Sequence, residues 1–188
     1  LQQTFSNVLQ LAQQAEKFGY TRYWLAEHHN ASNIASNATS ILIGYAAQGT
    51  KTIRVGAGGI MLPNHSPLII AEQFGTLAAL YPNRIDLGLG RAPGTDRETA
   101  EAIRSDFMQA AQQFPKELEK TQTYFSIDND EAMVRATVAE GADVPIYILG
   151  STVMSFNLQK NLNNLMSWLA LILSSHKQMN KLNVYQPL

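Results

Sequence analysis

The chain has no cysteine among its 188 residues. This absence excludes disulfide bonds, thiolate metal ligands and cysteine nucleophiles, and it fits a reducing, cytoplasmic compartment. Net charge is also small, at −1, so bulk electrostatics give no reason to expect nucleic acid or an anionic membrane as a partner. No basic segment followed by an apolar run opens the chain, so we expect no signal peptide. The apolar stretch 165–173 is too short to cross a bilayer.

Helical and strand patterns alternate along the chain. A helical pattern over 37–48 is expected to bury Ile41, Leu42 and Tyr45, and Pro67 after Ser66 is typical of a helix start. Short connections between such elements predict a parallel sheet with crossover helices, either an open doubly wound sheet or a (β/α)8 barrel. Only four strands are clear, whereas a barrel needs roughly eight. These expected strands are 22–26, 51–57, 84–89 and 144–149.

The first chemical candidate is the stretch "YWLAEHHN" (23–30), an apolar run that ends in an acid and two histidines. Side chains alternate between the faces of a strand, so Glu27 cannot easily join both His28 and His29 around one metal ion. Two interpretations remain open. The stretch is either a solvated strand end with a structural histidine or an active-site position, because ligands of parallel α/β folds bind at the carboxyl ends of strands.

Three further stretches also follow strand ends. The glycines of "VGAGGIMLPNH" (55–65) indicate a bulge, a strand kink or close approach of a flat ligand. "DLGLGRAPGTD" (86–96) lacks the dinucleotide fingerprint, and its Arg91 is either a grip for phosphate or carboxylate or a surface arginine.

The last of these stretches is "YILGST" (147–152), in which Gly150 and Ser151 come directly after a strand. They form either a phosphate-binding turn or a plain helix N-cap. Four chemical stretches at the ends of strands together predict one pocket for a flat, anionic ligand.

The blocks "RYWLAEHHN" and "TKTIRVGAGGIMLPNHSPLIIAEQFGTLAALYPNRIDLGLGRAPGT" closely resemble the bacterial luciferase-like flavin monooxygenases. The resemblance covers about 4–151. It implies an α/β fold of the (β/α)8 TIM-barrel type, here incomplete, because the first family strand would precede residue 1 and the last strands are missing. The chain is then one partial barrel domain (1–188), with a divergent tail (152–188) in which Ser175-His176 only partly matches the family.

The resemblance also implies roles for individual residues. His28 matches a catalytic histidine, and Glu27 an acid beside it in the flavin pocket. A cis peptide between Gly58 and Gly59 would support the flavin ring. No metal is expected. Cofactor binding is assigned to Ala57, Gly58, Gly59, Arg91, Gly150 and Ser151.

The implied activity is that of a flavin-dependent monooxygenase or oxidoreductase. It would use O₂ and reduced FMN, supplied by a separate flavin reductase, to oxygenate a small, aldehyde-like organic substrate. Two alternatives are an oxidoreductase that uses the deazaflavin F420 and a non-catalytic, truncated barrel fragment. Family members often form homodimers, and neither nucleic acid nor a membrane is an expected partner.

Overall fold

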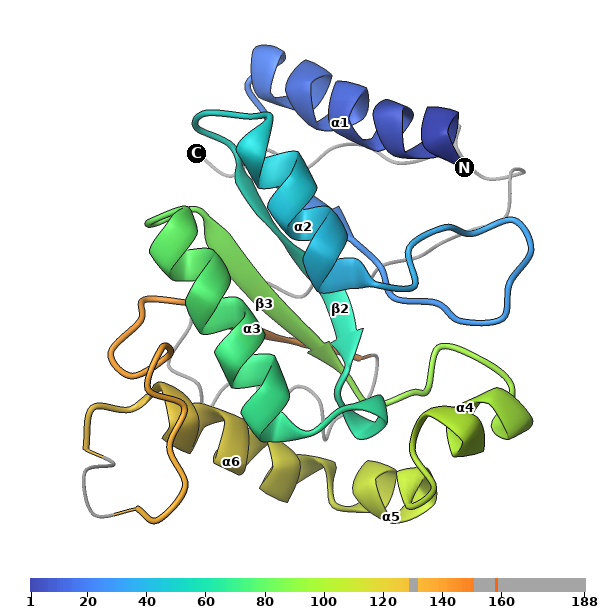
Figure 1. The fold of residues 1–188 in the computed structure, drawn as a ribbon, viewed down its shortest axis with the longest axis vertical. Helices are drawn as coiled ribbons and strands as arrows, with labels where there is room; N and C mark the ends of the chain where they lie inside the picture. The colour runs from blue at the N-terminus through green and yellow to red at the C-terminus, as the bar shows by residue number, and fades with distance from the viewer. Residues whose placement is uncertain (129–131, 151–157, 159–188) are drawn as a thin grey trace.

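The structure, a computed structural model, describes residues 1–128, 132–150 and 158 (Figure 1). Its centre is a four-stranded parallel sheet in which the strands lie in chain order. The predicted strand order and direction are therefore confirmed. Within the described residues the sheet is open and does not close into a barrel. The strands are β1 (Arg22–Leu25), β2 (Arg54–Met61), β3 (Ile85–Gly90) and β4 (Ile146–Leu149).

Helices connect the strands, as expected for parallel pairing. Pro67 is the first residue of its helix, and the polar region 97–125 forms three helices. None of the helices in the described part of the chain is both long and apolar enough to cross a bilayer. The helices are α1 (Gln2–Lys17), α2 (Thr39–Gln48), α3 (Pro67–Leu80), α4 (Arg97–Ile103), α5 (Phe107–Gln112) and α6 (Phe114–Phe125), and a 3₁₀ turn η1 (Leu62–Asn64) follows β2.

The main core lies between one face of the sheet and helices α2, α3 and α6, of which α2 and α3 lie side by side across the strands (Figure 1). Val55 and Leu87 of the sheet belong to the same buried cluster as Phe74 of α3, and all three are fully buried. The expected burial on α2 was partly wrong. Ile41 is 72% exposed and Tyr45 41% exposed. Leu42 is buried as expected, and the helix also buries Ile43, Ala46 and Ala47.

Strand β2 runs through its glycines to Met61, four residues beyond the predicted end. Its register against β3 shifts between Ala57 and Ile60, which agrees with a bulge, one of the three alternatives for these glycines. The peptide between Gly58 and Gly59 is cis, as predicted. The two backbones approach closely here. A Cβ added to Gly88 would lie 2.3 Å from the Ala57 carbonyl oxygen, so this position of β3 accepts only glycine without a shift of the strands.

The opposite face of the sheet carries a buried ion cluster. Asp86 is fully buried; its Oδ2 accepts hydrogen bonds from Arg22 Nε at 3.1 Å and Trp24 Nε1 at 3.0 Å. Its Oδ1 accepts one from Arg54 Nε at 2.8 Å. Arg22 also donates to the hydroxyl of Tyr147 at 3.2 Å, so the cluster joins all four strands.

Glu16 at the end of α1 fastens that helix to the start of β2. Its Oε1 accepts the backbone N–H groups of Lys51, Thr52 and Ile53 at 2.9, 2.6 and 2.9 Å. Burial raises the pKa of the carboxyl, but these N–H groups outweigh that effect and lower the pKa from 4.5 to about 2. The ionised form is therefore the one that the fold stabilises.

We expect Glu16→Gln to lower the free energy of unfolding at pH 7 by about 1–2 kcal/mol, discounted for partial exposure. Because the folded pKa is depressed, the contribution of Glu16 is complete above its unfolded value and is lost as pH falls from about 4.5 toward 2. Urea unfolding of both proteins at several pH values checks this. The exposed residue Glu119, changed to Gln, is the control. A stability difference that stays constant down to pH 2.5 would contradict the assignment.

Candidate active site

The carboxyl ends of β1, β2 and β3 lie at one edge of the sheet, as their parallel pairing requires. Glu27, His28 and His29 follow β1 directly. Asn64 and His65 follow β2 through the turn η1. The loop 91–96 follows β3 and contacts the residues after β1. Three segments that are distant in sequence therefore build one site.

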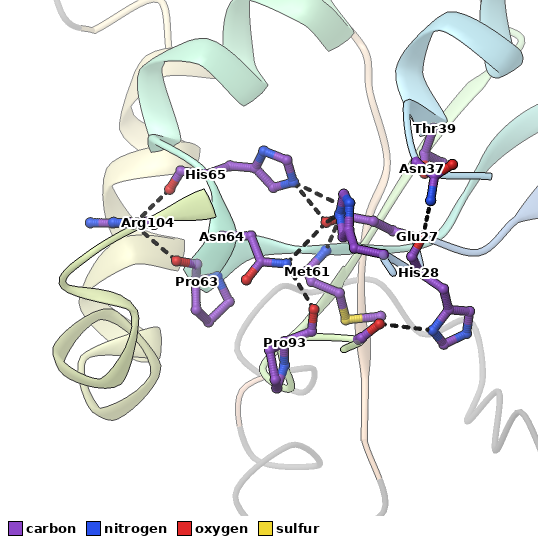
Figure 2. Close-up of polar contacts among 12 residues, drawn as sticks. Glu27, His28, Asn37, Thr39, Met61, Pro63, Asn64, His65, Pro93 and Arg104 are labelled. Atoms are coloured by element: carbon purple, nitrogen blue, oxygen red, sulfur yellow. Dashed lines mark hydrogen bonds and ion pairs between the residues drawn. The ribbon is translucent and has the colours of Figure 1, made fainter. Parts of the chain in front are cut away.

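Glu27 is the centre of this site, and its side chain is 1% exposed. Oε1 accepts hydrogen bonds from His29 Nε2 at 2.9 Å, His65 Nε2 at 2.9 Å and Asn64 Nδ2 at 3.2 Å. Oε2 accepts from the backbone N–H of Met61 at 3.0 Å and from His65 Nε2 at 3.0 Å. Figure 2 shows His65, Asn64 and Met61 converging on the carboxylate. The buried acid thus ties the ends of β1 and β2 together.

The surroundings of Glu27 stabilise its ionised form. Burial raises the pKa of the carboxyl, but the hydrogen bonds from His65, His29 and the Met61 N–H outweigh it, and the net pKa lies below the ordinary value. The group is consequently an acceptor at neutral pH, and a carboxylate with this many donors is held in one orientation.

His28 points away from Glu27 (Figure 2). Its ring Nδ1 lies 3.2 Å from the carbonyl oxygen of Gly94. Its backbone is fixed on both sides: the N–H donates to Ser36 O at 3.3 Å, and the carbonyl accepts from Asn37 Nδ2 at 2.7 Å. Strand alternation predicted that Glu27 would not join both histidines, and the structure agrees, because Glu27 binds His29 and not His28.

The loop 91–96 is fastened over the ends of β1 and β2. The carbonyl oxygen of Pro93 accepts from Asn64 Nδ2 at 2.8 Å, and the hydroxyl of Thr95 donates to the carbonyl of His29 at 3.0 Å. The loop therefore cannot move without breaking contacts to both neighbouring segments.

Comparison with known proteins identifies the family. The model of the luciferase-like monooxygenases matches residues 1–152 of the chain. The chain belongs to the luciferase-like monooxygenase family. The uncharacterised protein YvbT of Bacillus subtilis is 58% identical over 157 residues, which are 83% of this chain and 46% of that protein. A luciferase-like monooxygenase of Escherichia coli K12 is 51% identical over 160 residues, 85% of this chain and 48% of that protein. The chain thus spans about half the length of these relatives.

Solved structures have the same fold. Apo-MsnO8 superposes with a TM-score of 0.76 at 36% identity, over 83% of this chain and 47% of that chain. An F420-dependent secondary alcohol dehydrogenase with a bound F420–acetone adduct gives a TM-score of 0.66 at 18% identity, over 82% and 51% of the two chains. The FMN complex of the oxygenating constituent of 3,6-diketocamphane monooxygenase of Pseudomonas putida gives 0.63 at 23% identity, over 79% and 46%. At these lower identities the likeness concerns the fold alone.

Of the remaining residues that the family resemblance singled out, Arg91 and Gly150 lie at the same edge of the sheet. Arg91 follows β3 and is exposed, and no hydrogen bond or ion pair to another described residue engages its side chain. Ala57, Gly58 and Gly59 lie in the middle of β2. Gly150 follows β4 and is exposed. Ser151 and the predicted divergent tail fall outside the described residues, apart from residue 158.

The residues present are compatible with an anionic cofactor at this edge of the sheet. Arg91 is exposed there, and a guanidinium suits an anionic substituent. The buried glycines Gly58, Gly59, Gly88 and Gly90 let the backbones of β2 and β3 pack closely, since an added Cβ at any of them would lie 2.3–3.0 Å from a neighbouring atom. Among the described residues no group of three or more acidic, histidine or cysteine side chains has the arrangement of a metal site.

The sequence analysis did not identify His65, Asn64 and Gly94 as parts of the site. For His65 and Asn64 there was a signal, since "PNH" comes at the end of a second strand, beside the strand that ends in "EHH". For Gly94 the signal was weaker: a glycine in the polar loop after β3. Only the folded chain shows that its carbonyl reaches the residues after β1.

Proposed function

We propose that this chain forms the flavin-binding half of a monooxygenase that uses reduced FMN and O₂ to oxygenate a small, aldehyde-like organic substrate. His28 would act as the proton-transferring group. The observation that carries the proposal is the position of His28 at the carboxyl edge of the sheet, with its backbone and one ring nitrogen fixed. Family membership supports the reaction class.

Each residue has a distinct part in the proposed reaction. Bound reduced flavin supplies the electrons with which O₂ is activated. Ala57, Gly58 and Gly59 would support the ring, and Arg91 would hold an anionic part of the cofactor. Gly150 and Ser151 would bind its phosphate. Glu27 would keep the ends of β1 and β2 in register, so that His28 faces the reacting atoms.

His28 suits proton transfer because an imidazole ring has one nitrogen that can donate a proton and one that can accept a proton. Its ring is partly exposed, so it can reach a ligand, while its main chain is bonded on both sides. Fixed geometry of this type is what makes acid–base catalysis efficient. A separate flavin reductase would provide the reduced cofactor.

The choice of FMN over F420 rests on the family description and on the FMN-bound structure of similar fold. F420 is the second candidate because an F420-dependent dehydrogenase shares that fold. The two cofactors differ in the chemistry of the ring, so a binding experiment separates them.

We expect the purified chain to bind oxidised FMN, with quenching of flavin fluorescence. Arg91→Ala should weaken binding about 10-fold or more, since it removes a charge-assisted contact to an anionic group. Arg97→Ala is the matched control, because Arg97 is also exposed but pairs with Glu101 on its own helix. Titration of FMN and of F420 into all three proteins decides the cofactor. Absence of saturable binding of either would reject the proposal and favour a non-catalytic fragment.

A further inference from the structure

We propose that the carbonyl group of Gly94 sets the tautomer of His28, so that Nε2 is the ring atom that exchanges protons. Gly94 is then a positioning residue for the reaction. The relevance of this role to catalysis rests on the proposed function, whereas the tautomer itself is a property of the protein alone.

The geometry at the carbonyl of Gly94 carries the inference. Its oxygen lies 3.2 Å from His28 Nδ1 and also accepts the backbone N–H of His29 at 3.3 Å. A carbonyl oxygen is only an acceptor, so the hydrogen of the first contact must belong to Nδ1. In the neutral ring the lone pair is then on Nε2, because the hydrogen bond of one ring nitrogen decides the state of the other.

The two other histidines of the site have the opposite arrangement. His29 and His65 both direct Nε2 at the carboxylate of Glu27, at 2.9 Å. A carboxylate whose pKa is lowered accepts rather than donates, so both rings carry their hydrogen on Nε2. These contacts give one histidine of the Nδ1–H form and two of the Nε2–H form. Within the described part of the chain no hydrogen bond engages Nε2 of His28, so this atom can accept one from a ligand.

Residue 94 needs to be glycine for this contact. Its φ is +67°, a conformation that other residues rarely adopt, and an added Cβ would lie 2.8 Å from Glu27 O and 3.1 Å from Met61 Cγ. The carbonyl oxygen of Glu27 belongs to the backbone and cannot turn away. A side chain at 94 would therefore displace the peptide unit that carries the acceptor for His28.

The loop around Gly94 is fastened on both sides, which keeps the carbonyl in place. Pro93 accepts from Asn64, and Thr95 donates to the carbonyl of His29. The residues on either side of Gly94 are therefore anchored to β2 and β1, and the carbonyl of Gly94 faces the ring of His28 between these anchors. The chemical consequence is that a substrate or cofactor group next to His28 must present an O–H or N–H to Nε2.

The direct test is ¹⁵N NMR of the imidazole nitrogens in the whole chain at a pH where the rings are neutral. Signals are assigned with His28→Gln, His29→Gln, His65→Gln and His176→Gln. We expect His28 to show a protonated Nδ1 and an unprotonated Nε2, and His29 and His65 to show the reverse. A protonated Nε2 on neutral His28 would overturn the proposal, whether or not the chain binds FMN.

The second test compares Gly94→Ala with Gly19→Ala. Gly19 also has a positive φ, of +81°, but an added Cβ meets nothing within 4 Å, so this variant reports backbone strain alone. Gly94→Ala should lose the Nδ1–H signature of His28, and any FMN-dependent oxygenation should fall by about 10²-fold. Gly19→Ala should keep both the Nδ1–H signature of His28 and the rate of oxygenation. Retention of the Nδ1–H signature of His28 in folded Gly94→Ala would overturn the role of Gly94. Failure of both Gly94→Ala and Gly19→Ala to bind FMN would reject only the proposed function.

Discussion

Asp86→Ala is expected to lower the free energy of unfolding by about 3–5 kcal/mol, the usual cost of breaking a buried ion pair by removing one partner. Asp86 is fully buried, and its carboxylate neutralises both Arg22 and Arg54. The side chains of these arginines are only 30% and 23% exposed, so water cannot fully replace the lost partner. Trp24 would also lose the acceptor of its indole N–H.

Urea unfolding followed by circular dichroism measures this change. Asp86→Asn keeps the shape of the side chain but removes the charge, and it provides a measurement if Asp86→Ala does not fold. Asp143→Ala is the matched control, since Asp143 is exposed and its loss should change stability by no more than about 0.5 kcal/mol. A loss below about 1 kcal/mol for both Asp86 variants would show that the cluster adds little to stability.

His28→Ala is expected to leave FMN affinity nearly unchanged while turnover falls by about 10²–10⁴-fold, the usual contribution of a positioned acid–base group. Among the described residues the ring of His28 makes one hydrogen bond, to Gly94, so its removal leaves the remaining contacts described for the site in place. The initial rate of aldehyde oxygenation with photoreduced FMN and O₂ gives turnover, and fluorescence titration gives affinity.

His29→Ala is the matched control, one residue further along and on the other side of the chain. Its ring is 18% exposed and donates to buried Glu27, so its loss should cost stability, about 1–3 kcal/mol, more than turnover. If His29→Ala abolishes turnover while His28→Ala keeps it, the roles of the two histidines are reversed. If neither variant loses turnover, the histidines are structural.

Local patterns in the sequence were enough to predict the parallel sheet. The strands are short and largely apolar, and each of the first three is followed by a helix before the next strand, so the short connections favour a parallel arrangement. The predicted first and last residues of the strands were less accurate. The strand predicted to end at Ala57 continues to Met61, because glycine weakens strand propensity while the neighbour β3 still pairs with the chain beyond the bulge.

Burial on α2 was not predictable from its own sequence. This ten-residue helix is apolar over most of its length, in the sequence "ILIGYAA". Periodicity alone therefore does not say which side of the helix faces the sheet. The packing of α2 against β1, β2 and α3 buries Ile43 completely and leaves Ile41 exposed. The choice depends on neighbours that are distant in sequence.

The sequence by itself determined the family, the order and direction of the strands, and the placement of His28 and Arg91 at one edge of the sheet. The family follows from the resemblance of long sequence blocks, and the strand order and shared edge follow from local patterns and from the rule that parallel strands have their carboxyl ends at one edge. Only the tertiary structure decided the partners of the buried acids and of His28. A hydrogen bond depends on ångström-scale distances between residues such as Glu27 and His65, 38 positions apart, and no local pattern specifies such a distance.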